Sequence, residues 1–241
     1  MKFCSHRGGM FYTPENTMPA FLDALEKGFE IIETDPCYTK DGRIVLMHDK
    51  TINRTCINPD GSAIEKPITI EESTYEELLY YDAGLRKGEK FRGTKIPLLA
   101  ELLSAAEGKD VIISLDKRIG TNEIEPLFDI VASYNTKVCF STKDMERIEK
   151  VLSRFPDAFI NYDGPATEEM LERVTARVNP EQLFVWMYLD RPNFDFLEST
   201  RKASVERCAL VKRYARLGIG NINNPSDVYD AIKFEPDFVE I

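Results

Sequence analysis

The sequence predicts an α/β fold, a (β/α)8 TIM barrel formed by a single domain of residues 1–241. Short apolar runs alternate with amphipathic stretches along most of the chain, and the runs are rich in β-branched and aromatic residues. About eight such strand–helix units fit into 241 residues. A repeated strand–helix–strand order gives a parallel sheet, and eight units of it close into a barrel.

Nine apolar runs have the length and composition of buried strands. They are residues 2–6, 30–35, 43–49, 110–116, 137–142, 158–163, 183–190, 217–223 and 237–241. The amphipathic stretches between most of them predict helices at residues 18–28, 98–109, 124–134, 145–155, 168–178, 196–218 and 227–234. The first helix has Asn16 or Thr17 as its N-cap.

Nine strands are one too many for the barrel, so we assign residues 43–49 to an antiparallel hairpin after the second strand. Only a few residues separate this run from residues 30–35, and they include Lys40-Asp41-Gly42, a tight-turn signal. A parallel crossover needs a dozen or more residues. Pairing Lys40 with Arg43 across the turn brings Asp35 opposite His48.

Residues 50–98 interrupt the alternation of strands and helices. The segment is polar, rich in turn residues and too long for an ordinary loop between a strand and a helix. We therefore expect a small inserted subdomain of about residues 50–98 over one end of the barrel.

Charge and composition exclude several classes of protein. The net charge is −10 and no basic cluster is visible, which argues against a nucleic-acid partner. Five scattered cysteines without a CxxC pair indicate reduced thiols rather than disulfides or a zinc site. No apolar run is long enough to span a membrane, and no aromatic-rich stretch suggests stable membrane association.

The start of the chain bears on its compartment. The first strand begins at Lys2 and leaves no room for a signal peptide, so we expect a cytoplasmic protein. An exported protein whose signal had been trimmed would have the same sequence. The oligomeric state is left open.

The chain has two histidines, and both fall where strands end, together with three acids. His6 ends the first strand, Glu33 and Asp35 end the second, His48 ends the hairpin strand and Asp116 ends the next parallel strand. Catalytic side chains of TIM barrels gather at this end of the strands. Each residue alone also has a structural explanation: a packing histidine, capping or solvated carboxylates, or a surface ion pair. The occurrence of all five at the same end of the strands favours an active site over these separate structural explanations.

The residue types at this end of the strands indicate phosphoryl chemistry. Glu33 and Asp35 share one face of a strand, where two carboxylates repel unless a cation lies between them. Oxygen donors without a nearby cysteine suit Mg²⁺ or Ca²⁺. Two histidines can act as base and acid around a reacting group. Arg7 offers a planar donor fork for a phosphate, and the two glycines after it allow a sharp turn.

Several long motifs of the chain resemble the glycerophosphodiester phosphodiesterase family. They are "SHRGG" followed by "PENTMPAF", then "IETDPCYTKDGRIVLMHDKTINRT", and further on "YEELLYYDAG" and "KIPLLAELL". The resemblance is dense over residues 1–118 and compatible in topology beyond them. It implies a TIM barrel with a small subdomain inserted after the HD strand.

The resemblance also implies roles for single residues. His6 and His48 would be the acid–base pair, and Arg7 would hold the phosphate. Glu33 and Asp35 would bind one divalent cation, Mg²⁺ or alternatively Ca²⁺.

The family's third metal ligand comes from an N-I-E-x-K strand end, which "SLDKR" matches best. Asp116 would then be the third ligand, with Arg118 in place of the substrate-binding lysine. An alignment shifted by one step would place Ser114 there instead.

A second departure from the family lies near the C-terminus. Gly220 stands where the family has a tryptophan. Trp186, the only tryptophan of the chain, lies on the preceding strand, and we expect it to fill the same space and contact the substrate.

The reaction implied by the resemblance is hydrolysis of a small-molecule glycerophosphodiester to glycerol 3-phosphate and an alcohol. Two alternatives stay open. One is a phospholipase-like barrel enzyme that acts on intact lipid with similar residues, and the other is a non-catalytic phosphate-binding relative. The leaving alcohol and the native metal are left open as well.

Overall fold

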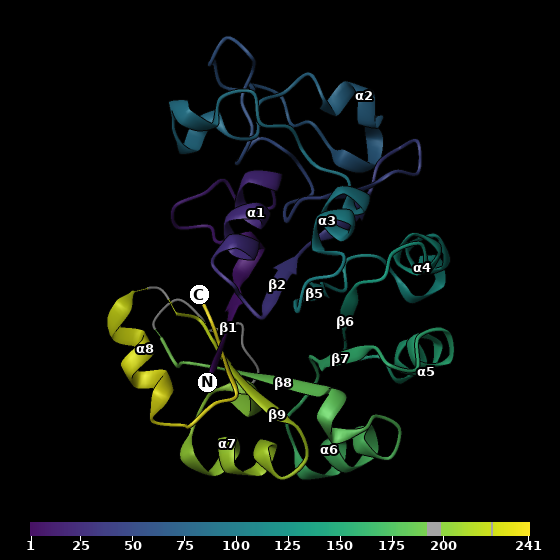
Figure 1. Ribbon diagram of the computed structural model, residues 1–241, viewed down its shortest axis with the longest axis vertical. Coiled ribbons are helices and arrows are strands. Elements are labelled where there is room, and N and C mark those ends of the chain that lie inside the picture. The colour runs from purple at the N-terminus through teal and green to yellow at the C-terminus, as the bar shows by residue number, and fades with distance from the viewer. Residues whose placement is uncertain (192–198, 223) are drawn as a thin grey trace. The chain divides into compact units, whose positions relative to one another are not determined.

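The computed structural model describes residues 1–191, 199–222 and 224–241, and it confirms the expected α/β barrel (Figure 1). Eight strands form a closed barrel in the order β1-β10-β9-β8-β7-β6-β5-β2. The barrel strands are β1 (Lys2–Ser5), β2 (Ile31–Thr34), β5 (Ile112–Leu115), β6 (Lys137–Thr142), β7 (Phe159–Tyr162), β8 (Leu183–Tyr188), β9 (Arg216–Gly220) and β10 (Phe238–Glu240). Each lies within or next to one of the predicted runs.

Helices fill most of the connections between these strands. They are α1 (Met18–Glu26), α3 (Leu99–Ala106), α4 (Glu125–Ala132), α5 (Met145–Arg154), α6 (Glu168–Thr175), α7 (Val205–Lys212) and α8 (Pro225–Ile232). The Thr17 backbone caps α1, but the side chain of Asn16 turns elsewhere, as described below.

The helix predicted over residues 196–218 was wrong in extent. Ser204 caps α7, because its Oγ accepts a hydrogen bond from the backbone nitrogen of Arg207, so the helix begins at Val205. Before it, Ser199–Arg201 form a single 3-10 turn, and after it the chain enters β9 at Arg216. Residues 196–198 of the predicted helix, and residue 223 of the strand predicted over 217–223, lie outside the described residues.

The chain divides into two compact units, residues 5–137 and residues 1–4 with 138–241. The first unit contains β2, β5, the hairpin and the predicted insertion. In the second unit, β8 and β9 run side by side and α7 packs against β9 (Figure 1). The limits of the insertion and the single domain of residues 1–241 stay predictions.

The predicted hairpin exists, but its register is shifted by one residue. The hairpin pairs β3 (Pro36–Tyr38) with β4 (Ile44–Leu46) in antiparallel fashion, with Cys37 opposite Val45. Its loop is closed by Thr39, whose backbone nitrogen donates to the carbonyl of Arg43 and whose Oγ1 accepts from the nitrogen of Arg43. Asp35 is consequently opposite Met47, and the pairing of Asp35 with His48 was wrong.

Residues 50–98 contain one short helix, α2 (Tyr75–Leu78), and three 3-10 turns at Ile70–Glu72, Leu85–Lys87 and Glu89–Phe91. The segment shares a hydrophobic cluster with the hairpin, which we call the insertion cluster. Its buried members are Cys37, Val45, Met47, Ile52, Cys56, Ile70, Leu78, Ala83 and Ile96. Burial of these side chains, rather than a regular sheet, holds the segment on the hairpin.

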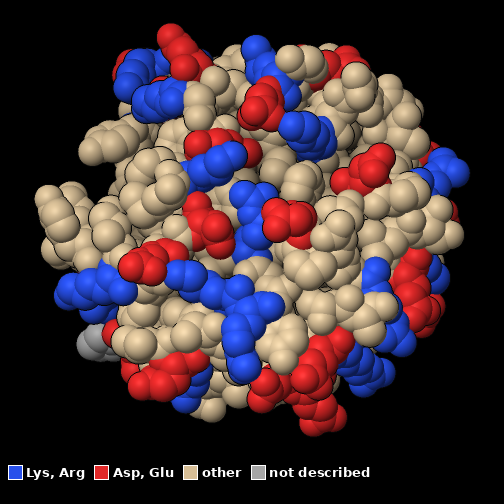
Figure 2. All heavy atoms as spheres, turned by 60° about the horizontal axis from the view of Figure 1, so that its bottom comes forward, with Lys and Arg blue, Asp and Glu red and all other residues tan. Residues whose placement is uncertain are grey.

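Further expectations concern thiols, membranes and charge. All five cysteines are buried and free. Over the described residues, every helix is too short or too polar to cross a membrane. Acidic and basic side chains are interspersed over the face drawn in Figure 2.

Candidate active site

The first strand delivers His6 and Arg7 through a tight left-handed turn. After β1, the 3-10 turn His6–Gly8 has positive φ angles of 51° at Arg7 and 79° at Gly8. A Cβ on Gly8 would lie 2.7 Å from Cδ1 of Phe21 and 2.9 Å from Cβ of Ala20, both on α1. Only glycine allows the turn to lie this close to α1.

The second strand and its neighbour deliver the carboxylates. β2 pairs in parallel with β5, with Glu33 opposite Ser114 and Thr34 opposite Leu115. The backbone nitrogen of Asp116 continues this ladder by donating to the carbonyl of Thr34. Alternation along a strand therefore places Glu33, Ser114 and the two aspartates beyond them, Asp35 and Asp116, on one face.

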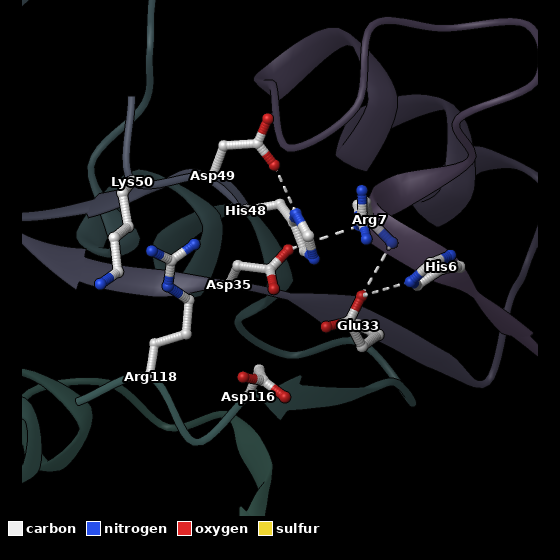
Figure 3. Close-up of a pocket in the computed structure, with 9 residues that line it drawn as sticks. All are labelled: His6, Arg7, Glu33, Asp35, His48, Asp49, Lys50, Asp116 and Arg118. Carbon is white, nitrogen blue, oxygen red and sulfur yellow. Dashed lines mark hydrogen bonds and ion pairs between the residues drawn. The ribbon is translucent and has the colours of Figure 1, made fainter. Parts of the chain in front are cut away.

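These residues line a pocket of about 700 Å³ in the unit of residues 5–137 (Figure 3). The lining residues are His6, Arg7, Glu33, Asp35, His48, Asp49, Lys50, Asp116 and Arg118. The pocket brings together every predicted site residue except Trp186. Three cationic and four acidic side chains meet beside two histidines, a balance that suits an anionic substrate held together with a cation.

Arg7 is held between three carboxylates. Its backbone nitrogen donates to Oε2 of Glu33 at 3.0 Å, and its Nη1 donates to Oε1 of Glu15 at 2.9 Å. Its Nε lies 3.6 Å from Oδ2 of Asp35. The guanidinium is thus fixed in position beside the carboxylates of the pocket.

Asp35 is positioned by Asn16, a residue that the sequence pattern predicts only as a helix cap. Nδ2 of Asn16 donates to Oδ2 of Asp35 at 2.7 Å, while Oδ1 of Asn16 accepts from the hydroxyl of Thr34 and the backbone nitrogen of Asp35. Asn16 is buried and adopts a left-handed conformation, with a φ of 52°. Its contacts hold the end of β2.

His6 faces Glu33, with 3.9 Å between Nε2 of His6 and Oε2 of Glu33. Burial, together with the positive charge of Arg7, lowers the pKa of His6 to about 4. His6 is therefore neutral at pH 7 and able to accept a proton.

His48 lies after β4 and is oriented by its neighbour in the chain. Nδ1 of His48 lies 2.6 Å from Oδ1 of Asp49, so Nδ1 carries the hydrogen of this bond and Nε2 is the other reactive nitrogen. Hydrogen bonds from Arg54, and then from His48, lower the pKa of Asp49 to about 2.

The carboxylates have the chemistry of a site for a hard cation. Burial raises the pKa of Asp35, and the charge of Asp116 adds to this, although Asn16 and Arg7 act in the opposite direction. A divalent cation between Asp35 and Asp116 would relieve their repulsion. As they stand, no three His, Cys, Asp or Glu side chains among the described residues form a ready-made metal site. Asp116 lines the pocket, whereas Ser114 lies two residues earlier, opposite Glu33, and is buried.

Two basic side chains, Lys50 and Arg118, also line the pocket. In Figure 3, Lys50 and Arg118 lie on one side of Asp35, and Glu33 and His6 lie on the other. Nη1 of Arg118 donates to the carbonyl of Met47 at 3.0 Å, which fixes this arginine beside the hairpin.

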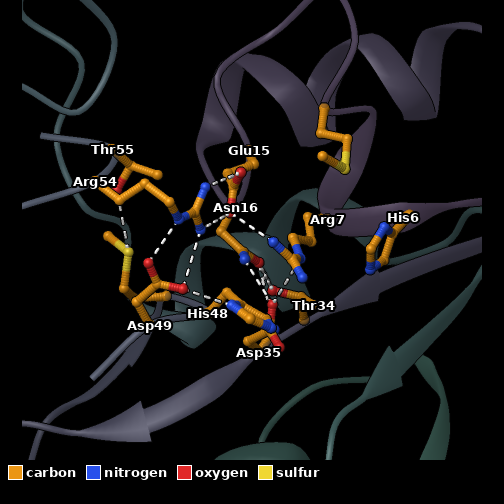
Figure 4. A network of polar contacts seen from close by, with 12 residues as sticks. His6, Arg7, Glu15, Asn16, Thr34, Asp35, His48, Asp49, Arg54 and Thr55 are labelled. Carbon is orange, nitrogen blue, oxygen red and sulfur yellow. Dashed lines mark hydrogen bonds and ion pairs between the residues drawn. The ribbon is translucent and has the colours of Figure 1, made fainter. Parts of the chain in front are cut away.

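A polar network behind the pocket was not predicted from the sequence. Glu15 contacts both Arg7 and Arg54, and Arg54 also contacts Asp49, the partner of His48 (Figure 4). Glu15 lies in the motif "PENT" and Arg54 in "NRT", but the two residues are 39 positions apart in the chain. No local pattern joins them.

Trp186 lies in the other unit, where its ring packs over Gly218 and is 5% exposed. A Cβ on Gly220 would lie 3.0 Å from the ring of Tyr188 and 2.8 Å from Oε2 of Glu240. Tyr188, rather than Trp186, thus fills the space beside Gly220, which corrects that expectation. A substrate contact of Trp186 stays a prediction.

Comparisons with known proteins agree with this geometry. The model of the glycerophosphoryl diester phosphodiesterase family matches residues 6–156. A glycerophosphodiester phosphodiesterase of Caldanaerobacter subterraneus is 39% identical over 116 residues, which cover 48% of this chain and 44% of that protein. A human lysophospholipase D is 30% identical over 159 residues, covering 62% and 47%. The matches span less than half the length of these relatives.

Solved structures show the same fold over the whole chain. A phosphodiesterase of Oleispira antarctica, solved in complex with its product sn-glycerol-3-phosphate, superposes with a TM-score of 0.78 at 18% identity, covering 100% of this chain and 92% of that one. A glycerophosphoryl diester phosphodiesterase homologue of Silicibacter pomeroyi gives the same TM-score at 20% identity, covering 100% and 89%. The match over residues 6–156, which carry the whole pocket, shows that this chain belongs to the glycerophosphoryl diester phosphodiesterase family.

Proposed function

We propose that the protein hydrolyses glycerophosphodiesters to glycerol 3-phosphate and an alcohol, with the help of one divalent cation. The observation that carries the proposal is that both histidines and Arg7 line one pocket with the carboxylates of Glu33, Asp35 and Asp116. The activity named for the curated relatives, and the product bound to the Oleispira antarctica enzyme, support the same substrate class.

Glu33, Asp35 and Asp116 are the residues that would hold the cation, Mg²⁺ or alternatively Ca²⁺. When bound, the cation supplies electrostatic stabilisation of charge on the phosphoryl oxygens. Arg7 and Arg118 approach the pocket from opposite sides of Asp35 and would bind the phosphate (Figure 3). Trp186 is proposed to contact the substrate in place of the family tryptophan, whose position Gly220 occupies.

The two histidines have different surroundings, and we assign them different roles. His6 is the neutral base, and it takes the proton of the substrate's own 2-hydroxyl as that oxygen attacks phosphorus. His48 is the acid: Asp49 bonds its Nδ1, and Nε2 gives its proton to the leaving alkoxide as the phosphorus–oxygen bond breaks. The attack is intramolecular, so no second reactant has to be captured.

The cyclic phosphate formed in this way is opened by water with the roles reversed. His48, now neutral, takes a proton from water as the water oxygen attacks phosphorus. His6 returns its proton to the 2-oxygen as the ring bond breaks. Glycerol 3-phosphate is released, and both histidines are back in their starting states.

The test is release of glycerol 3-phosphate from glycerophosphocholine and glycerophosphoethanolamine, in EDTA and after Mg²⁺ or Ca²⁺ is added back. We expect turnover only with added metal. His48→Ala should lower kcat by about 10²–10⁴-fold. In the first turnover, His48→Ala should slow release of a p-nitrophenyl leaving group, which departs without protonation, far less than release of an alkyl alcohol, whereas His6→Ala should slow both alike.

Other outcomes would favour the alternatives. Faster turnover of phospholipid vesicles than of deacylated diesters would indicate a phospholipase-like enzyme. Binding of glycerophosphodiesters by the folded protein without turnover, in any metal, would indicate a non-catalytic relative. An unchanged rate in His48→Ala would contradict the assignment of the acid.

A further inference from the structure

Arg54 makes the largest set of ion-pair contacts in the network behind the pocket, yet it does not line the pocket itself. Its Nε donates to Oδ2 of Asp49 at 2.6 Å, and its Nη2 lies 3.2 Å from Oδ1 of the same carboxylate. Its Nη1 and Nη2 donate to the two oxygens of Glu15 at 2.8 and 2.7 Å. One planar guanidinium therefore contacts two carboxylates through two-pronged hydrogen bonds (Figure 4).

Each of the two carboxylates contacts a proposed functional residue. Oδ1 of Asp49 bonds Nδ1 of His48 at 2.6 Å, and Oε1 of Glu15 bonds Nη1 of Arg7 at 2.9 Å. Arg54 is thus joined through one acid to His48 and through the other to Arg7.

The charges of the network support a fixed arrangement. Burial alone would raise the pKa of Glu15, but hydrogen bonds from Arg54 and the charge of Arg7 lower it below the usual range. The pKa of Arg54 is raised by its hydrogen bonds to Glu15 and Asp49. Both carboxylates are therefore ionised at pH 7 and would repel each other without the arginine.

The insertion cluster places Arg54. Ile52 and Cys56, on either side of it, are fully buried in that cluster, and the backbone nitrogen of Cys56 donates to the carbonyl of Ile52 at 2.8 Å. The nitrogen of Ile52 in turn donates to the carbonyl of Ile68. This buried turn directs the guanidinium toward the carboxylates. The predicted insertion contributes Lys50 alone to the pocket lining. It also reaches the pocket through Arg54, which contacts the lining residue Asp49.

We infer that Arg54 is a positioning residue that holds Asp49 against His48 and Glu15 against Arg7, so that the insertion keeps the proton donor and the phosphate-binding arginine in place together. Without Arg54, Asp49 loses the groups that fix its orientation, and His48 is no longer held in one tautomer. The effect on proton transfer rests on the proposed function, but the effect on the tautomer of His48 does not.

The first test is the state of the His48 ring, observed without any substrate. The chain has two histidines, so ¹⁵N-labelled protein gives a simple imidazole spectrum, and His6→Gln leaves His48 alone in it. We expect Nδ1 of His48 to carry the proton in the starting protein and a mixture of tautomers in Arg54→Met. Arg54→Lys, which keeps a charge but cannot fork to both acids, should lie between them.

The second test is kinetic and separates positioning from general damage. We expect Arg54→Met to lower kcat on an alkyl diester by about 10- to 100-fold. In the first turnover, Arg54→Met should slow release of a p-nitrophenyl leaving group much less than release of the alkyl alcohol, as for His48→Ala. In a His48→Ala background, Arg54→Met should lower kcat far less than it does alone, because both changes remove the same proton donor.

Arg92→Met is the matched control. Arg92 makes an exposed ion pair with Glu89 within the same predicted insertion, three residues away in the chain, and its loss should change neither the His48 spectrum nor kcat. An unchanged His48 spectrum in folded Arg54→Met and Arg54→Lys would overturn the inference. Equal slowing of the first-turnover release of both leaving groups would overturn the role of Arg54 in holding the proton donor. A wild-type protein without turnover would instead count against the proposed function, and the spectra would still decide the role of Arg54.

Discussion

At the scale of single residues, Asn16 shows how much the pocket depends on a side chain outside it. The side chain of Asn16 bonds the carboxylate and backbone of Asp35 and the hydroxyl of Thr34, and its backbone nitrogen donates to the carbonyl of Arg7. It therefore ties the turn after β1 to the end of β2. A side-chain amide suits this position because it donates on one side and accepts on the other.

We predict that Asn16→Ala weakens activation by the metal. Asp35 loses the donor that orients its carboxylate, and loss of such a partner typically lowers metal affinity by about 10- to 100-fold. The measurement is the Mg²⁺ concentration that gives half-maximal turnover. Asn53→Ala is the control, because the side chain of Asn53 bonds backbone groups of Ile64, Lys66 and Ile68 in the predicted insertion. Equal midpoints in Asn16→Ala and the starting protein would contradict the prediction.

The lowered pKa of His6 predicts a pH dependence of stability. Between pH 6.5 and about 4, the unfolded chain binds a proton at His6 that the folded chain does not. The free energy of unfolding should therefore fall as the pH decreases through this window. His6→Gln, measured by urea unfolding in EDTA at several pH values, should show a shallower fall. Parallel curves for the two proteins would argue against a neutral His6.

At the scale of elements, the first turn approaches α1 closely and so constrains the pocket residues that this turn carries. Gly8 has both a positive φ and side-chain atoms of Phe21 and Ala20 within 3 Å of where a Cβ would lie. Gly28, after α1, has a similar φ of 72° but nothing within 4 Å of that position. A side chain at Gly28 would meet backbone strain alone, whereas one at Gly8 would meet backbone strain and overpacking.

We predict that Gly8→Ala lowers the free energy of unfolding by about 2–4 kcal/mol, from the left-handed conformation and the displacement of α1 together. Gly28→Ala should cost only about 1 kcal/mol, from the conformation alone. Urea unfolding of both variants measures the difference. Similar losses in the two variants would show that α1 yields freely and does not constrain the turn.

The hairpin illustrates what element-scale patterns do and do not specify. A tight turn between two apolar runs indicated an antiparallel pair, and the pair is present. The register depends on whether the turn is closed by Lys40 and Arg43 or by Thr39 and Arg43. The second closure occurs because Thr39 bonds Arg43 and Asp41, while the backbone nitrogen of Lys40 donates to Ser73 in the predicted insertion. That partner is remote in sequence, so the turn motif alone could not specify it.

At the scale of the whole molecule, the net charge of −10 coexists with a pocket that contains three cations. Figure 2 shows basic and acidic side chains interspersed on the face that it draws. The proposed phosphate recognition would use Arg7 and Arg118 in the pocket, which follow the ends of β1 and β5. Total charge is thus a guide to nucleic-acid partners but not to small phosphate ligands.

The sequence by itself determined the barrel and most of the pocket. Alternating apolar runs and amphipathic stretches specify strands and helices, because burial requires one apolar face on each helix and apolar runs in each parallel strand. Parallel strands bring their carboxyl ends to a common edge, so residues such as Glu33 and Asp35 could be placed in a site before their contacts were known. Motif resemblance supplied the family.

Only the tertiary structure decided the network behind the pocket, the hairpin register and the residue beside Gly220. Arg54 and Glu15 are 39 residues apart, and Asn16 and Asp35 are 19 apart. Such partners meet because separate elements pack against one another, and hydrogen bonds between them leave no periodic trace in the sequence. Tyr188 likewise lies beside Gly220 through the pairing of β8 with β9. Local patterns encode elements, whereas contacts between elements depend on packing.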